Sequence, residues 1–274
     1  MSERETYPAG VPCWVETLQP DPRAALDFYG QLLGWEFGDP GPMPGALRGE
    51  YYVARVKGRD VAGIGSLPDL GGPAVPLWNT YIRVESANEA VATAQAAGGK
   101  LLIGPLEALP AGRLAVLVDP VGAAFCVWEA RGREGAQLVN EPRTWAMSSL
   151  HTTDAESAKA FYGSVFGWHP EAIGSPETQM ILWRLPGYVG EETQQPIPRD
   201  VAAVMAPTGD AAAPIPPHWN VNFYVDGVDA TVAHATSLGG QVIVPPLDTP
   251  GFRSAALTDP QGAAFSISQL TVSP

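Results

Sequence analysis

The stretch Phe28-Tyr29-Gly30-Gln31-Leu32-Leu33-Gly34 recurs about half a chain later as Phe161-Tyr162-Gly163-Ser164-Val165-Phe166-Gly167. Further landmarks follow in the same order in both halves: Trp78-Asn79 with Trp219-Asn220, Gly98-Gly99 with Gly239-Gly240, and Asp119-Pro120-Val121-Gly122 with Asp259-Pro260-Gln261-Gly262. A match of this length and order indicates two copies of one domain. We expect the copies at residues 8–130 and 144–270, joined by a charged and polar linker at 131–143.

The sequence of each copy predicts two successive modules, and each module has a strand, a helix and further strands. In the first module an apolar strand at 11–18 leads to Asp21 and Pro22, which favour the start of a helix. Gly34 follows the apolar stripe of that helix and is expected to end it. The other elements expected in the first copy are strands at 51–56, 61–64, 78–84, 101–103, 114–118 and 125–128, and a helix at about 87–97.

Composition sets limits on the partners of this chain. Its 274 residues are 45% hydrophobic, which is enough for two hydrophobic cores. The formal net charge of −13 argues against binding to nucleic acid or to an anionic membrane, since both require a basic face. The same charge would attract a cationic ligand, although it could equally serve solubility alone.

Cysteine usage and hydropathy indicate the compartment. Cys13 and Cys126 are the two cysteines, and no CxxC spacing exists for a zinc or disulfide framework. The N-terminus is polar, and no apolar run approaches the roughly 18 residues of a membrane-spanning helix. We therefore expect a soluble, cytoplasmic protein whose oligomeric state the sequence leaves open.

The repeated Phe-Tyr-Gly and Asp-Pro-X-Gly segments resemble those of the vicinal oxygen chelate superfamily, which includes glyoxalase I, extradiol dioxygenases and bleomycin-resistance proteins. The resemblance implies an α+β fold of tandem duplicated domains, each made of paired βαβββ modules that form a curved, half-open sheet around a cavity. More narrowly, the chain resembles actinobacterial tandem-domain members, one of which belongs to the daunorubicin/doxorubicin biosynthetic pathway.

The same resemblance identifies where metal-using members carry their ligands. In those members, His occupies the first strand of each module and Glu the last strand. The matching residues here are Trp14, Asn79 and Cys126 in the first copy and Met147, Asn220 and Ser266 in the second. None of them is His, Asp or Glu, and a lone cysteine is a poor site for a divalent cation. We therefore expect neither a metal nor another cofactor.

Alternation along the strands predicts which side chains face each cavity. The candidate ligand-binding residues are Trp14, Glu16, Asn79, Tyr81, Cys126 and Trp128 in the first copy, and Met147, Ser149, His151, Asn220, Asn222, Tyr224 and Ser266 in the second. An apolar slot with a few polar anchors is a common form of small-molecule site. The alternative is that these aromatic residues only fill a core. His151 could act as a general base or be structural, and no catalytic residue is assigned.

These features favour a metal-free protein that binds an apolar aromatic small molecule, such as an antibiotic or an anthracycline-like polyketide intermediate. Its role would be self-protection, sequestration or support of biosynthesis, and Glu16 would suit a cationic substituent. The first cavity is favoured because it has more aromatic residues, while the second copy has a longer loop at 188–200. A glyoxalase-type lyase or isomerase, an oxygenase component and an interaction protein with vestigial cavities remain alternatives.

Overall fold

The computed structural model describes residues 3–69, 75–173, 180–188, 201–207, 216–249 and 251–271. The first half forms a nine-stranded mixed, open sheet in the order β2-β4-β5-β1-β6-β9-β8-β7, with β3 paired to β4. Its elements are β1 (Pro12–Gln19), α1 (Pro22–Leu33), β2 (Glu36–Phe37), β3 (Gly41–Pro42), β4 (Glu50–Val56), β5 (Arg59–Ser66), β6 (Leu77–Arg83), α2 (Ala87–Ala96), β7 (Lys100–Ala108), β8 (Gly112–Val118) and β9 (Ala124–Ala130).

The second half repeats this plan in an eight-stranded sheet, β11-β12-β13-β10-β14-β17-β16-β15. Its elements are β10 (Trp145–Thr152), α3 (Ala155–Phe166), β11 (His169–Ile173), β12 (Met180–Arg184), β13 (Val201–Pro207), β14 (His218–Tyr224), α4 (Val228–Ser237), β15 (Gln241–Thr249), β16 (Phe252–Thr258) and β17 (Ala264–Leu270). The chain is therefore an α+β protein of two tandem domains, as the sequence predicted. The long loop predicted at 188–200 lies outside the described residues except for Tyr188.

The ends of α1 follow directly from the sequence. Asp21 caps the helix by accepting hydrogen bonds from the backbone N–H groups of Arg23 and Ala24, and Pro22 occupies the first turn. Gly34 ends the helix in the left-handed conformation, with φ of 65°. In the second domain Asp154 and Gly167 cap α3 in the same way.

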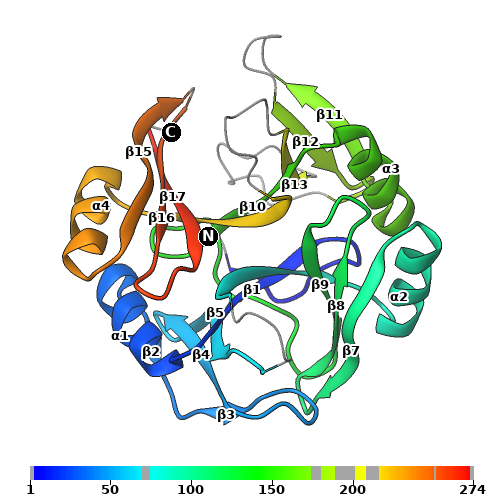
Figure 1. Ribbon diagram of the computed structural model, residues 1–274, viewed down its shortest axis with the longest axis horizontal. Helices are drawn as coiled ribbons and strands as arrows, with labels where there is room; N and C mark the ends of the chain where they lie inside the picture. Colours follow the sequence, from blue (N-terminus) through cyan, green and yellow to red (C-terminus); the bar gives the residue numbers. More distant parts are fainter. Residues whose placement is uncertain are drawn as a thin grey trace.

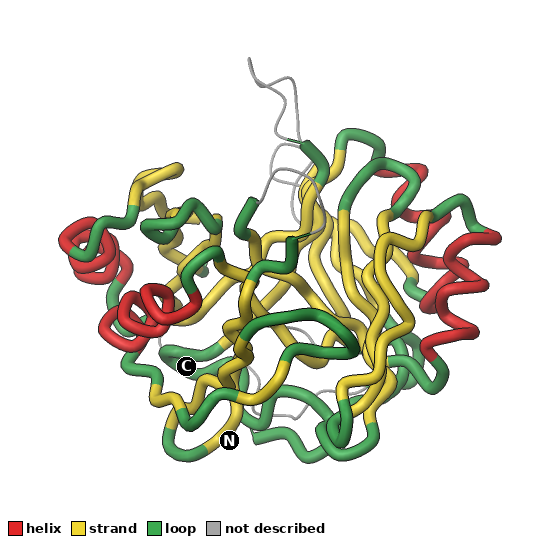
Figure 2. Tube along the Cα trace, turned by 60° about the horizontal axis from the view of Figure 1, so that its bottom comes forward, coloured by secondary structure: helices red, strands yellow, loops and turns green. Residues whose placement is uncertain are grey.

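The helices lie in two pairs on the outside of the molecule, and each pair joins the two domains (Figures 1 and 2). Helix α1 contacts α4, and α2 contacts α3. One hydrophobic core therefore combines Phe28 and Trp78 with Phe223 and Phe265, and the other combines the second module of the first domain with α3. The chain has two cores, as its composition suggested, but each core is shared between the domains.

The repeated motifs meet across this interdomain contact. Trp78 Nε1 donates to the Tyr29 hydroxyl, which donates to Asp259 Oδ2 at 2.9 Å. The equivalent contact with the two domains exchanged runs from Trp219 through Tyr162 to Asp119 Oδ2, with a Tyr–Asp distance of 3.0 Å. The tyrosine of each Phe-Tyr-Gly motif thus binds the aspartate of the other domain's Asp-Pro-X-Gly turn, and both carboxyl groups are buried.

The connecting segment 131–143 is packed against the first domain and is not a solvated tether. Ala136 and Leu138 are buried, and the Ala136 N–H donates to the carbonyl of Cys13 in β1 at 2.8 Å. Hydrophobic burial therefore fixes a segment whose composition is polar. Among the residues that the structure describes, no helix combines the length and apolar character needed to cross a bilayer.

Candidate functional site in the first domain

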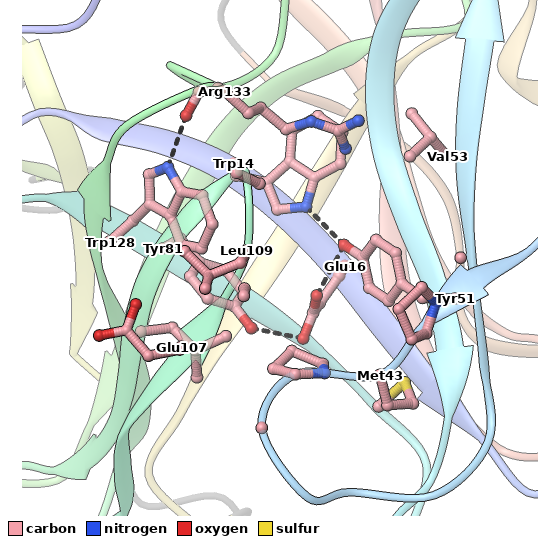
Figure 3. A pocket seen from close by; sticks show the side chains of 18 of the residues that line it. Trp14, Glu16, Met43, Tyr51, Val53, Tyr81, Glu107, Leu109, Trp128 and Arg133 are labelled. Carbon is pink, nitrogen blue, oxygen red and sulfur yellow. Dashed lines mark hydrogen bonds between the residues drawn. The ribbon is translucent and has the colours of Figure 1, made fainter.

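The concave face of the first sheet surrounds a cavity of about 720 Å³. Trp14 and Glu16 of β1, Tyr81 of β6 and Trp128 of β9 line it from adjacent strands (Figure 3). One rim is the segment 38–45, and another is formed by the end of β7 and the turn after it, at 107–111. A hydrogen bond of 2.8 Å from Gly45 N–H to the Glu107 carbonyl connects the two rims. The cavity is thus enclosed by both modules of one domain.

Glu16 lies at the centre of a hydrogen-bonded group in this cavity. The Tyr51 hydroxyl donates to Glu16 Oε2 at 2.8 Å, and the Tyr81 hydroxyl donates to Oε1 at 2.5 Å. Trp14 Nε1 donates to the Tyr51 oxygen at 2.9 Å, which directs the Tyr51 proton towards Glu16. Figure 3 shows this chain of contacts from the indole to the carboxyl group. The carboxyl group is therefore held in one orientation from both sides.

Two glycines in β5 make room for Tyr51. Tyr51 of β4 pairs with Gly65, and its ring extends along the sheet over Gly63. A Cβ atom at Gly63 would lie 2.0 Å from the Tyr51 hydroxyl oxygen and 3.1 Å from Glu16 Cβ, while one at Gly65 would lie 3.0 Å from Tyr51 Cδ2. No side chain could occupy position 63 without displacing the tyrosine. Gly63 is thus required for the Tyr51–Glu16 hydrogen bond.

Two guanidinium groups add positive charge to the wall. Arg133 lies over the Trp14 ring, with Cζ 5.4 Å from the ring centroid, a cation–π contact. Arg133 and Arg55 both line the cavity and both pair with Asp60, at 3.3 Å and 2.9 Å. Two guanidinium groups share one carboxylate, so these three residues carry one positive charge in excess. The sequence suggested Glu16 as a partner for a cationic substituent and did not predict this positive charge.

Burial governs protonation in the cavity. Desolvation raises the pKa of Glu16, and the hydrogen bonds from Tyr81 and Tyr51 only partly oppose the shift. Burial also raises the pKa of the Cys126 thiol, with a further contribution from Glu16. The thiol is therefore protonated at neutral pH. The carboxyl group of Glu16 is a stronger base than an exposed glutamate.

The predicted first-copy residues fall into two groups. Trp14, Glu16, Tyr81 and Trp128 line the cavity, and each is less than 10% exposed. Asn79 and Cys126 are buried but do not line it, which corrects their predicted position. Cys126 is paired in register with Tyr81, whose ring provides lining surface while the thiol does not. Both tryptophans also belong to a hydrophobic core, so core packing and cavity lining coexist.

The second-copy candidates lie on the concave face of the other sheet, in a separate region. Ser149 pairs with Asn220 and Met147 with Asn222, and all four are half-buried. Ser266 Oγ donates to Asn220 Oδ1 at 3.2 Å. Other contacts among the described residues of this face are Ser149 with His151, Ser268 with Asn222, the stacked rings of His151 and His218, and the stacked rings of Tyr224 and Phe252. Most of these described side chains are polar, and several of them bond to one another.

His151 is held in its neutral form. Burial lowers its pKa to about 4, and the neighbouring His218 contributes in the same direction. The two imidazole rings are nearly parallel, with centroids 4.8 Å apart. A neutral imidazole at pH 7 can accept a proton, but with a pKa near 4 it is a weak base. This environment favours the structural interpretation of His151 over the general base.

The side chains present do not suit the divalent metal that the fold family commonly uses. Glu16 has both oxygens engaged by tyrosine hydroxyls, and Cys126 is a buried thiol rather than a thiolate. Across the described part of the chain, no three His, Cys, Asp or Glu side chains are grouped to hold a metal ion. Such an ion needs several donors at one point.

Sequence reasoning missed Tyr51, Arg133 and both rim segments. A signal for Tyr51 existed, since it begins a predicted strand and the neighbouring strand carries Gly63 and Gly65 two residues apart. Two glycines on one face of a strand indicate the close approach of another group. Arg133 lies in the segment assigned to the linker, and only tertiary packing brings it onto Trp14.

Comparison with known proteins agrees with this architecture. Residues 14–128 match the model of the glyoxalase-like domain, and residues 146–267 match that of the glyoxalase/bleomycin resistance protein/dioxygenase superfamily. CFP32 of Mycobacterium bovis, whose name describes a glyoxylase, is 37% identical over 272 residues and covers 97% of both chains. DauV of Streptomyces sp., named an anthracycline biosynthesis protein, is 32% identical over 281 residues, covering 96% of this chain and 94% of its own.

Solved structures share the fold at much lower identity. The Mn(II)-bound glyoxalase of Novosphingobium aromaticivorans aligns with a TM-score of 0.60 and 17% identity, over 95% of this chain and 82% of its own. The 2,3-dioxygenase LapB of Pseudomonas sp. KL28 aligns with a TM-score of 0.62 and 13% identity, over 97% and 94%. Both domain models and the full-length relatives lead to one conclusion: the chain belongs to the glyoxalase/bleomycin resistance protein/dioxygenase superfamily, the vicinal oxygen chelate fold.

Proposed function

We propose that the first-domain cavity binds a flat aromatic small molecule without a metal ion, as part of the biosynthesis of, or self-protection against, an anthracycline-like polyketide. The observation that carries the proposal is the cavity itself. Its volume of about 720 Å³ falls within the range of small-molecule sites. Two tryptophans and a tyrosine supply apolar walls, and a fixed carboxyl group supplies a polar anchor.

The ligand class rests on the chemistry of the walls. Aromatic pairs contribute about 0.5–1.5 kcal/mol each beyond area burial, so a planar ligand gains most from Trp14, Tyr81 and Trp128. The relative DauV is named for anthracycline biosynthesis, which supports a polyketide of this kind. The site would function inside the cell, with no nucleic acid or membrane as partner.

The charged groups of the protein act on the ligand differently at long range and at short range. The net charge of −13 favours a cationic substituent at long range. At short range Glu16 is already hydrogen-bonded, and Arg55 and Arg133 line the same cavity. We therefore propose that the aromatic body provides most of the affinity and that a cationic sugar adds little.

Calorimetric titration tests both parts. Daunorubicin and its uncharged aglycone are titrated into the wild-type protein, into Trp128→Leu and into the control Trp219→Phe, whose indole lies in the interdomain core. We expect both compounds to bind with affinities within about threefold of each other, and Trp128→Leu to weaken both about tenfold. Trp219→Phe should bind normally. Failure of both compounds to bind, or unchanged affinity in Trp128→Leu, would contradict the proposal.

A further inference from the structure

The Glu16 group exists in only one of two copies of the same fold. At the positions that match Glu16 and Tyr81, the second domain has Ser149 and Asn222, each held in the same strand pairing. Glu16 is paired with Gly63, whereas Ser149 is paired with Val204, so the glycine that admits Tyr51 is also missing from the second copy. The fold forms without these residues. Their presence in the first copy therefore needs another explanation.

A buried carboxyl group is costly for the protein. Glu16 is only 6% exposed, and its contacts are two neutral hydroxyl groups and no direct cation. Burying a charge without a counter-ion destabilises the folded state, and hydrogen bonds from neutral groups offset only part of that cost. The group also faces a cavity rather than solid core. A partly desolvated, precisely oriented base at the wall of an apolar pocket is the arrangement that proton abstraction requires.

Positive charge lies in the same cavity. Arg133 over Trp14 and Arg55 of β4 share the carboxylate of Asp60, so these three residues together carry one positive charge. Asp39 and Glu107 also line the cavity, and Glu107 is paired with Arg113 and Arg131. A fixed positive charge stabilises an oxyanion that develops on a bound carbonyl group. The cavity thus contains a base and guanidinium groups that favour an enolate.

We propose that the first-domain cavity catalyses a metal-free proton transfer, in which Glu16 is the base that acts on a carbon next to a ketone of a flat aromatic ligand. This inference rests on the proposed function, since it uses the same cavity and ligand class. The C–H bond breaks, its proton passes to a Glu16 oxygen, and its electron pair forms the enolate. The proton returns to the same carbon or to the far end of the conjugated system. The net reaction is an epimerisation or isomerisation that consumes no oxidant or reductant.

Tyr51 and Tyr81 are positioning residues in this reaction. Their hydroxyl groups occupy one lone pair on each Glu16 oxygen and leave the others for the substrate. They also oppose the increase in the pKa of Glu16 that burial causes. Removing either hydroxyl should therefore raise the pKa of Glu16 further and move the acid limb of the rate profile to higher pH. A purely structural role would leave that limb unchanged.

The test uses 1-tetralone, a flat benzo-fused ketone whose protons next to the carbonyl exchange slowly at neutral pH. The purified full-length protein is incubated with this probe in D₂O, and loss of the C2 proton signal is followed by NMR. Calorimetry measures binding of the same probe. The variants are Glu16→Gln, Tyr51→Phe and Tyr81→Phe, and the control is Glu156→Gln on the exposed surface of α3.

We expect the wild type and Glu156→Gln to accelerate exchange, and Glu16→Gln to lose about 100-fold of that rate while binding 1-tetralone within about threefold of the wild type. The pH profile between 4 and 9 is interpreted with the groups beside Glu16, namely Tyr51, Tyr81 and Cys126. It also takes account of the charged groups that line the same cavity, namely Asp39, Arg55, Glu107 and Arg133. The two Phe variants should move its acid limb upwards, which supports the assignment.

Two results would overturn the inference. Binding of 1-tetralone without accelerated exchange, or equal exchange by the wild type and Glu16→Gln, would exclude Glu16 as a base and leave the binding function standing. Absence of binding by 1-tetralone and by both daunorubicin compounds would overturn the binding function and, with it, the proton transfer. A near-ultraviolet circular dichroism spectrum identical to the wild type confirms that each variant is folded.

Discussion

The concave faces of the two domains carry different side chains on matching strand registers. In the first domain Trp14 is paired with Tyr81, and Glu16 with Asn79, around an aromatic cavity. In the second, the same places hold Met147 with Asn222 and Ser149 with Asn220, so a methionine, a serine and two amides replace the aromatic and acidic groups. The helix-covered faces are alike instead, since both carry the Trp–Tyr–Asp contact. Duplication kept the interdomain contact and let the concave faces diverge.

This contrast shows which residues the fold needs and which the site needs. Tyr29 with Tyr162, and Asp119 with Asp259, are identical in both copies and are buried at the interdomain contact. On the concave faces, Trp14, Glu16 and Tyr81 of the first copy are replaced by Met147, Ser149 and Asn222 in the second. The motifs that identify the family are therefore structural in this chain, and its candidate chemistry resides in residues outside those motifs.

The largest loss of folding stability is expected at the Tyr–Asp contacts, which are the same in both halves. Asp119→Asn and Asp259→Asn each place an amide N–H₂ where the wild-type carboxyl group accepts several hydrogen bonds. Each should lower the free energy of unfolding by on the order of 2–3 kcal/mol, and by similar amounts, as measured by urea denaturation. Asp226→Asn, at an exposed position, is the control and should change stability by less than about 0.5 kcal/mol. A large effect in only one half would disprove the symmetry of the contact.

The next largest loss of stability is expected at Gly63, a glycine that the second copy lacks at the matching position. Gly63→Ala puts a methyl group against the Tyr51 hydroxyl and should displace that ring. We expect a loss of about 1–3 kcal/mol in stability, as for other overpacked sites, together with weaker ligand binding. Gly30→Ala in α1 is the control, because its Cβ atom would make an ordinary contact of 3.4 Å with the Trp35 carbonyl. Equal stability of the two variants in thermal denaturation would show that Tyr51 can move freely.

A smaller effect is expected on ligand affinity, which should depend on Trp14 in the first domain and not on Met147 in the second. Trp14 is buried as well as cavity-lining, so Trp14→Ala would combine folding and binding losses. Trp14→Phe keeps a ring but removes the indole donor to Tyr51 and part of the aromatic surface. Its affinity for the daunorubicin aglycone should fall about tenfold, whereas Met147→Leu at the matching place should be neutral. If calorimetry showed the reverse pattern, the binding site would belong to the second domain.

The smallest effect is a difference in pH dependence between the faces. Burial raises the pKa of Glu16, so the folded protein binds this proton more tightly than the unfolded chain does. The stability that results from this proton is present at low pH and is lost as the pH rises through the pKa of the folded state. Burial lowers the pKa of His151 to about 4, so its contribution is complete above the usual value near 6.5 and is lost as pH falls towards 4.

Thermal melting between pH 4 and 8 measures this difference. The melting temperature of the wild type relative to Glu16→Gln should decrease with rising pH. Relative to His151→Gln, it should decrease with falling pH, by an amount equivalent to about 1 kcal/mol after allowance for the solvent exposure of the ring. Parallel pH profiles for the wild type and a variant would mean that the group in question titrates as it does in the unfolded chain.

Much of the fold could be predicted because local signals agree with the tertiary structure. Asp21, Pro22 and Gly34 mark the ends of α1 through bonds made within a few residues. The internal repeat predicted two domains, since each copy repeats the same order of strands and helices. Strand alternation also placed Trp14, Glu16, Tyr81 and Trp128 on one face, because side chains on a strand alternate whatever lies opposite.

The rest depended on contacts between residues distant in the sequence. Cys126 and Asn79 were expected to line the cavity, and neither does. Alternation predicts the face of the sheet on which a side chain lies, but it does not predict which neighbouring side chains separate it from the cavity. Arg133 reached Trp14 from a segment whose composition resembles a linker. The sequence suggested that Glu16 would face a cationic substituent, whereas in the structure it is buried and accepts hydrogen bonds from Tyr51, which passes over Gly63, and from Tyr81.

The sequence by itself determined the duplication, the α+β fold, the helix ends and the lack of the family's metal-ligand residues at their matching positions, because each is written in residue types at fixed spacing. Tertiary structure alone decided that each hydrophobic core is shared by both domains, that the two repeated motifs bind each other across the interface, and that one domain holds the Glu16 group. The physical reason is that the hydrogen bonds in these places join residues 43 to 230 positions apart in the chain, and no local sequence pattern identifies the partner.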